Sequence, residues 1–132
     1  MDYFLNSDNV YERLKSEYNK HGKLIVAVDF DDTLYDFHNK GRSYDDVIGL
    51  LRGLKEHVYI IIYTASKKER YPEIKRYLKE NQIPFDTINE NIKDINVPKG
   101  GKLYYNILLD DRAGLKESYE ILNRFSKNVI LE

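Results

Sequence analysis

The amino-acid sequence predicts an α/β fold, a three-layer α/β/α sandwich built on a five-stranded, mostly parallel sheet. Three observations lead to this prediction. Predicted strands and helices alternate along the chain, which is typical of parallel sheets. The strands are apolar throughout, as expected for strands that are buried on both faces. With 132 residues the chain fits one hydrophobic core, so we expect a single domain over residues 1–132.

The chain begins with a predicted helix. Asn9 and Glu12 have the spacing of a capping box, in which each residue bonds the backbone N–H of the other. Gly22 can adopt the left-handed conformation that often ends a helix. We therefore expect a helix over 9–20, with residues 1–22 forming a helical extension packed on the domain.

The rest of the chain alternates between apolar strands and amphipathic helices. Ser43 and Asp46 have N-cap spacing, and Pro72 suits the first turn of a helix, where a missing backbone donor costs nothing. The expected elements are strands over 24–28, 58–63, 85–88 and 105–109, helices from Ser43, over 72–81 and over 115–126, and a last, edge strand over 129–131. We see no internal repeat, low-complexity segment or linker.

Composition and charge exclude several function classes. The formal net charge is −1, so no global field attracts nucleic acid or membrane. The sequence has no cysteine, which excludes disulfides and thiolate metal sites and favours a reducing compartment. The N-terminus lacks the pattern of a signal peptide, and no apolar run is long enough to span a bilayer. We expect a cytoplasmic protein that does not bind membranes.

Carboxylates follow two of the predicted strands. Asp29, Asp31 and Asp32 come directly after the buried strand 24–28, and Asp110 and Asp111 end the strand 105–109. Ligands in open α/β sheets bind outside the carboxyl ends of the strands. Grouped carboxylates repel one another unless a cation lies between them, and oxygen ligands without cysteine or clustered histidine favour Mg²⁺. The sequence therefore predicts a Mg²⁺ site formed by carboxylates of these two segments.

Other polar residues near the strand ends can handle phosphate. Thr64 ends the strand 58–63, and either Lys102 or Lys99 lies before the last acidic strand. A hydroxyl and an ammonium group opposite a metal would hold phosphoryl oxygens and neutralise their charge. A carboxylate at a strand end can attack phosphorus, and a second one two residues later can protonate the leaving oxygen and then activate water.

These residues resemble, in order, the four motifs of the haloacid dehalogenase-like (HAD) phosphohydrolases. DFDDTL at 29–34 resembles the first motif, DxDx(T/V), and IIIYT at 60–64 resembles the second. A lysine supplies the third, and LLDD at 108–111 resembles the acidic fourth. The segment 102–112, KLYYNILLDDR, is also similar to small capless members of the family. The fold implied by this resemblance is Rossmann-like.

The resemblance also implies roles for individual residues. Asp29 would be the nucleophile and a metal ligand, and Asp31 the general acid/base, with its backbone carbonyl on the metal. Thr64 and Lys102 would hold the phosphoryl group, with Ala65 also at the substrate. Asp110 would complete the metal site, with Asp111 close behind. The catalytic residues are thus expected to be Asp29, Asp31, Thr64 and Lys102.

Several of these side chains have simpler interpretations. Asp32 fits a loop-capping residue, and Asp111 fits a helix N-cap as well as a water-mediated metal ligand. Lys99 competes with Lys102 for the catalytic role, although the spacing favours Lys102. His38 fits a solvated loop residue. The basic residues after Thr64 fit a solvated helix start as well as a guide for an anionic substrate: Lys67, Lys68 and Arg70.

The gaps between the motifs leave no room for a cap domain. A capless site would be open and would suit bulky phosphorylated substrates, such as nucleic-acid ends or proteins, although a homodimer could supply a lid for a small one. The loop 35–42 is the best candidate for a mobile cover, with Tyr35, Phe37 and His38 facing the substrate.

The sequence therefore predicts a Mg²⁺-dependent phosphomonoesterase that acts through an aspartyl-phosphate on Asp29. One alternative is a non-catalytic phosphate-binding module of the same fold. Another is a phosphatase specific for nucleotides or nucleic-acid ends. A signalling receiver domain is disfavoured, because the phosphorylated Asp of a receiver follows its third strand, with an acidic pair after the first.

Overall fold

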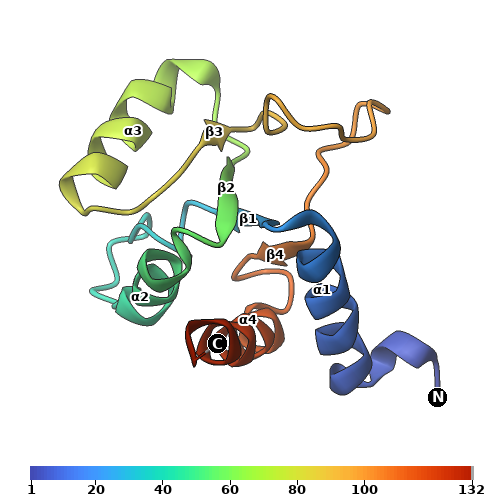
Figure 1. Ribbon diagram of the computed structural model, residues 1–132. Helices are drawn as coiled ribbons and strands as arrows, with labels where there is room; N and C mark the ends of the chain where they lie inside the picture. The colour runs from blue at the N-terminus through green and yellow to red at the C-terminus, as the bar shows by residue number, and fades with distance from the viewer. Residues whose placement is uncertain (132) are drawn as a thin grey trace.

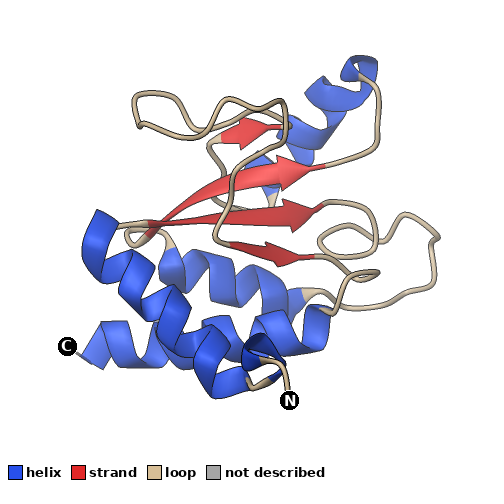
Figure 2. Cartoon of the chain, turned by 90° about the vertical axis from the view of Figure 1, so that its right-hand side faces the viewer, coloured by secondary structure: helices blue, strands red, loops and turns tan. Residues whose placement is uncertain are grey.

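A computed structural model describes residues 1–131 and shows an α/β protein in which helices flank a parallel sheet of four strands. The strand order is β3-β2-β1-β4. Figure 2 shows the four arrows pointing the same way. The strands are β1 (Leu24–Asp29), β2 (Val58–Tyr63), β3 (Thr87–Ile88) and β4 (Ile107–Leu109). This arrangement is compatible with the predicted Rossmann-like sandwich, but the prediction of five strands is wrong.

The missing strand is part of the last helix. We expected a helix over 115–126 and an edge strand over 129–131, but α4 runs without a break over Leu115–Leu131. No glycine or proline interrupts this segment. Leu122 and Phe125 are buried and Val129 packs against the same core, so these side chains follow the three- and four-residue spacing of one helix face. This spacing extends the helix through residues whose β-branched side chains resemble a strand.

The first helix, α1 (Ser7–His21), begins earlier than predicted. Its N-cap is Asn6, whose side chain accepts a hydrogen bond from the backbone of Asp8 at 2.9 Å. The predicted capping box at Asn9 is therefore wrong, and the Asn9 side chain donates to the carbonyl of Tyr3 in the short 3-10 helix η1 (Tyr3–Leu5). The predicted end is confirmed, because Gly22 is left-handed with φ of 82°.

Two helices cover one side of the sheet, and α1 lies on the other (Figure 1). They are α2 (Asp45–Leu54) and α3 (Tyr71–Glu80), and the short η2 (Lys68–Arg70) leads directly into α3. The α4 helix packs against β4, α1 and α2. The main core joins these helices to the strands through buried side chains that include Leu14, Val26, Val28, Leu51, Ile60, Ile62, Ile74 and Phe125.

A long irregular connection, residues 89–106, covers the opposite face of β1 and β2. Ile25 and Ile61 pack there against Ile92, in a second, smaller core cluster. The buried Asn106 fixes the end of this connection, because its Oδ1 accepts a hydrogen bond from the backbone N–H of Ile25 at 2.6 Å. The connection includes residues 105 and 106, so β4 is shorter than the predicted 105–109. The third strand, β3, is shorter than the predicted 85–88 because it begins at Thr87.

The connections after β1 and β2 are too short to contain a cap domain. Residues 30–44 hold a single isolated bridge between Asp31 and Tyr35, and residues 64–86 hold η2 and α3. Along residues 1–131 none of the helices is both long and apolar enough to cross a membrane.

Candidate functional site

The parallel register brings carboxylates from two strands together. In the pairing of β1 with β4, Val28 lies opposite Leu109, so the next residues, Asp29 and Asp110, follow neighbouring strand ends. Carboxylate oxygens of Asp29, Asp110 and Asp111 all lie within 4.8 Å of one another. The expected convergence of the first and last acidic segments is therefore present in the structure. This acidic cluster, Asp29, Asp110 and Asp111, is the centre of the candidate site.

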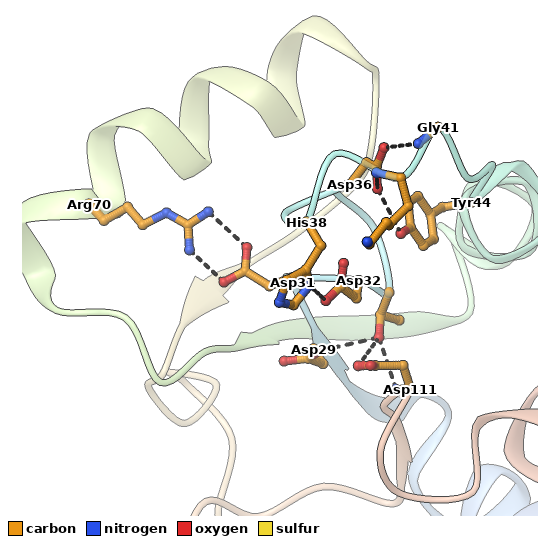
Figure 3. Close-up of polar contacts among 11 residues, drawn as sticks. Asp29, Asp31, Asp32, Asp36, His38, Gly41, Tyr44, Arg70 and Asp111 are labelled. Carbon is orange, nitrogen blue, oxygen red and sulfur yellow. Dashed lines mark hydrogen bonds and ion pairs between the residues drawn. The ribbon is translucent and has the colours of Figure 1, made fainter.

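A buried threonine links the two halves of the acidic cluster. The hydroxyl of Thr33 lies 3.2 Å from a carboxylate oxygen of Asp29 and 3.1 Å from one of Asp111. The same hydroxyl accepts a hydrogen bond from the backbone N–H of Asp111 at 3.0 Å. Figure 3 shows these contacts between Asp29 and Asp111. In the sequence, Thr33 stands out only as one residue of the first motif. Its linking role depends on a contact with Asp111, which lies 78 residues later in the chain.

Burial and the neighbouring carboxylates raise the pKa of Asp29. Burial raises the pKa of Asp29 to about 7, helped by a hydrogen bond with Asp111 and by the negative charges of Asp110 and Asp111, while the Thr33 hydroxyl lowers it. Such an arrangement disfavours three simultaneous negative charges. A divalent cation would remove the repulsion, and a donor set made only of carboxylate oxygens fits Mg²⁺. The residues present therefore fit the metal that the sequence predicts.

Asp31 is not part of the acidic cluster, and its side chain forms an ion pair with Arg70. Its two carboxylate oxygens accept hydrogen bonds from the two terminal nitrogens of Arg70, at 2.6 and 2.8 Å (Figure 3). Both side chains are largely buried, with exposed fractions of 26% for Asp31 and 20% for Arg70. Bidentate pairing of this kind fixes the orientation of a carboxylate. The predicted metal contact of Asp31 was through its backbone carbonyl, which this ion pair does not involve.

Arg70 is more than the solvated helix residue or substrate guide that we considered. Its guanidinium also donates to the hydroxyl of Ser66 at 2.7 Å. It lies 5.3 to 5.8 Å from the ring centres of three aromatic residues. These residues are Phe30, Tyr35 and Phe37. The pairing joins residues 39 positions apart, so local sequence pattern carries no signal for it.

The phosphate-binding residues predicted from the second and third motifs share a pocket. Thr64, Ala65 and Lys102 line a hollow of about 390 Å³. The wall of this pocket also includes Tyr63, the register partner of Asp29 on β2. Side chains of register partners extend from the same face of a parallel sheet, so the pocket adjoins the side of the sheet on which Asp29 lies. Both lysines are exposed, but Lys102 lines this pocket and Lys99 does not.

Asn89 holds the end of β2 in place, a role that the sequence alone does not reveal. Its side-chain oxygen accepts from the backbone N–H of Thr64 at 2.9 Å, and its amide nitrogen donates to the carbonyl of Thr64 at 2.7 Å. The amide also lies 2.9 Å from the hydroxyl of Tyr71. Thr64 is buried, and its hydroxyl accepts from the backbone of Ser66 at 3.1 Å. An asparagine after a short edge strand reads as a turn residue from sequence alone.

The loop 35–42 is held together by its own carboxylate. Asp36 accepts hydrogen bonds from the backbone N–H groups of Lys40 at 3.0 Å and Gly41 at 2.7 Å. Desolvation acts to raise the pKa of Asp36, but these bonds outweigh it and the pKa is lowered. Whether this loop moves over a substrate stays a prediction.

The two polar loop residues considered at sequence level, Asp32 and His38, contact each other. His38 Nδ1 lies 2.6 Å from one carboxylate oxygen of Asp32, and the Asp32 backbone donates to the carbonyl of Tyr35. Asp32 has a positive φ of 62°, in keeping with its predicted place in a turn. His38 is therefore paired with Asp32.

Comparison of the chain with models of known protein families, with curated proteins and with solved structures finds no match. The function is therefore inferred from the chemistry of the site.

Proposed function

We propose that this protein is a Mg²⁺-dependent phosphomonoesterase that forms an aspartyl-phosphate on Asp29. The observation that supports this proposal best is the grouping of Asp29, Asp110 and Asp111 within 4.8 Å at the ends of neighbouring strands. A pocket lined by Thr64 and Lys102 adjoins the same side of the sheet. Such a site offers a nucleophile, a cation site and donors for phosphoryl oxygens, as a phosphoryl transfer requires.

In the first step, a carboxylate oxygen of Asp29 forms a bond to phosphorus, and the bond between phosphorus and the ester oxygen breaks. The departing oxygen takes a proton from Asp31 and leaves as an alcohol. Thr64 and Lys102 bind the phosphoryl oxygens while the charge on them redistributes. Asp29, Asp110 and Asp111 would hold the Mg²⁺, which would supply neutralisation of the phosphoryl charge when bound.

In the second step, water replaces Asp29 on phosphorus. Asp31 accepts a proton from the water as its oxygen bonds to phosphorus, and the bond between phosphorus and the Asp29 oxygen breaks. Inorganic phosphate leaves, and Asp29 and Asp31 return to their starting states. One residue serves as acid and then as base, so the cycle needs no further proton carrier.

The ion pair between Asp31 and Arg70 bears directly on this mechanism. A carboxylate that accepts two hydrogen bonds from a guanidinium has a fixed orientation, which suits the base of the second step. To act as the acid of the first step, Asp31 has to carry a proton and give up at least one of these bonds. Arg70 is therefore a positioning residue for Asp31 in this proposal.

Hydrolysis of a generic aryl phosphate with Mg²⁺ tests the proposal. Asp29→Asn keeps the shape of the nucleophile and removes its reactivity, so we expect loss of phosphate release by a factor of 10³ or more, on the order of removing a catalytic nucleophile. Asp46→Asn makes the same chemical change at an exposed position on α2 and serves as the matched control. Equal rates for Asp29→Asn and the wild-type protein would contradict the proposal.

A second candidate is a non-catalytic module that binds phosphate. The observation that favours it is the same ion pair, because both oxygens of Asp31 are occupied by Arg70. This candidate predicts binding of Mg²⁺ and of a phosphomonoester without turnover across a broad substrate panel. Turnover that depends on Asp29 would exclude it.

A further inference from the structure

Two exposed aromatic side chains lie near the candidate site. Among residues 1–129, large hydrophobic side chains that are exposed occur in two places. One is the first five residues. The other is the carboxyl edge of the sheet, where Phe37 is 53% exposed and Tyr63 is 41% exposed. An exposed aromatic ring in the loop after β1 contributes little to the core, so its presence there suggests a ligand.

Phe37 is connected to the proposed catalytic machinery through one guanidinium. Arg70 lies 5.3 Å from the centre of the Phe37 ring and binds both carboxylate oxygens of Asp31. The Phe37 ring also packs edge-on against His38, with ring centres 5.1 Å apart. Arg70 thus contacts both the exposed Phe37 ring and Asp31. A flat group on the substrate could therefore stack there while its phosphate lies at Asp29.

The segments on either side of Phe37 and Arg70 are basic although the whole chain is not. Residues 35–42 and 64–70 contain exposed Lys40, Arg42, Lys67 and Lys68. The acidic residues of these segments are Asp36, which is occupied by backbone N–H groups, and Glu69. The net charge of the chain is −1 and carboxylates gather at the strand ends, so this positive charge is confined to the two flanking segments. A charged, elongated anion would be attracted to this edge.

We infer that the substrate is the phosphorylated end of a single-stranded nucleic acid. This inference rests on the proposed phosphoryl site at Asp29. In it, the terminal phosphate lies at Asp29, the base of the terminal nucleotide stacks on Phe37, and the exposed lysines and arginine contact the backbone phosphates. Aromatic platforms combined with basic grooves are how proteins bind single strands. A phosphopeptide would offer neither a stacking base nor a run of backbone anions.

The test measures binding, so that it does not depend on turnover. Asp29→Asn protein with Mg²⁺ is titrated into fluorescent oligonucleotides that carry a 5′-phosphate, a 3′-phosphate or no phosphate, and into a phosphoserine peptide. We expect one of the phosphorylated oligonucleotides to bind at least tenfold more tightly than the unphosphorylated one and the peptide. The two phosphate positions distinguish which end is recognised.

Variants of Phe37 test the stacking role. Phe37→Ala in the Asp29→Asn background should weaken oligonucleotide binding about tenfold, as loss of one base–aromatic stack does. Phe37→Trp should restore it, which a merely structural role for the loop would not require. Phe4→Ala removes a comparably exposed ring, 55% exposed in η1, and should have no effect.

The failure of this inference differs from the failure of the proposed function. Tighter binding of the phosphopeptide, or no response to Phe37→Ala, would overturn the nucleic-acid assignment even if the wild-type protein hydrolyses aryl phosphates. Tight, Phe37-dependent oligonucleotide binding without hydrolysis would support the nucleic-acid subsite and contradict the phosphatase.

Discussion

Asp29 and Asp110 lie at the ends of adjacent strands because Val28 and Leu109, the residues before them, are partners in the parallel register of β1 and β4. Two chain segments 81 residues apart thereby share one acidic cluster with Asp111. A slip of one residue in this register would turn one set of side chains to the other face of the sheet. The apolar strands thus determine where the carboxylates meet.

Mg²⁺ should stabilise the protein through the acidic cluster. A ligand that binds only the folded state raises the free energy of unfolding by about 2.7 kcal/mol at 100 times its dissociation constant. We expect this increase for the wild-type protein and for Asp46→Asn, and its loss in Asp110→Asn. Thermal unfolding with and without Mg²⁺ measures it. Equal Mg²⁺ responses in Asp110→Asn and Asp46→Asn would show that the ion binds elsewhere.

The metal-free protein should lose stability as the pH rises from about 4 to about 7. The pKa of Asp29 is raised to about 7 in the folded protein, so the folded state holds a proton that the unfolded state has lost. The stabilising effect is complete below the unfolded pKa of 3.8 and disappears as the pH passes 7. Screening of this half-buried group limits the effect to about 1–2 kcal/mol.

Asp29→Asn isolates this contribution, because Asn does not titrate. Urea unfolding of both proteins between pH 4 and pH 8 gives the difference in the free energy of unfolding at each pH. We expect the wild-type protein to become less stable relative to Asp29→Asn as the pH rises. A difference that is constant with pH would mean that Asp29 has an ordinary pKa.

Thr33→Val should weaken the acidic cluster. The variant keeps the shape of the buried side chain but leaves the backbone N–H of Asp111 without its acceptor and removes the hydroxyl from Asp29. Loss of a part-buried hydrogen bond costs about 0.5–1.5 kcal/mol. Thr33→Ser keeps the hydroxyl and is the control. We expect Thr33→Val to lower both the free energy of unfolding and the affinity for Mg²⁺ relative to Thr33→Ser.

Lys102, rather than Lys99, should bind the phosphoryl group. Lys102 lines the pocket with Thr64, and Lys99 is not among the residues that line it. Lys102→Met should reduce kcat/KM for an aryl phosphate by about 10²-fold or more, the size of effect seen when a preorganised electrostatic group is removed. Lys99→Met is the matched variant and should remain within twofold of wild type. The reverse order of effects would reassign the catalytic lysine.

Much of the fold was predictable because it depends on local pattern. The continuous apolar runs at β1 and β2 and the left-handed Gly22 are readable without tertiary information. The parallel strand order then brings Asp29 to Asp110, since carboxyl ends of neighbouring parallel strands meet at one edge. These parts of the site follow from general rules for α/β sheets.

Other features depend on contacts that a local pattern does not encode. The segment 129–131 has strand-like composition, but Val129 packs against the core that contains Phe125, and the segment continues α4. The pairing of Asp31 with Arg70 joins two connections, and the Asn89 bonds to Thr64 join two strand ends. The last two are tertiary contacts between polar groups, which hydrophobic periodicity does not encode.

Detection of a covalent intermediate on Asp29 tests the central claim most directly. The protein is mixed with phosphate-labelled substrate and Mg²⁺, quenched in acid and reduced with borohydride, which converts an acyl phosphate to an alcohol. We predict label on the wild-type protein that is lost from Asp29→Asn, and reduction at position 29 in the peptide that contains β1. Turnover with label on another residue, or with no covalent intermediate at Asp29 under any quench time, would contradict this account.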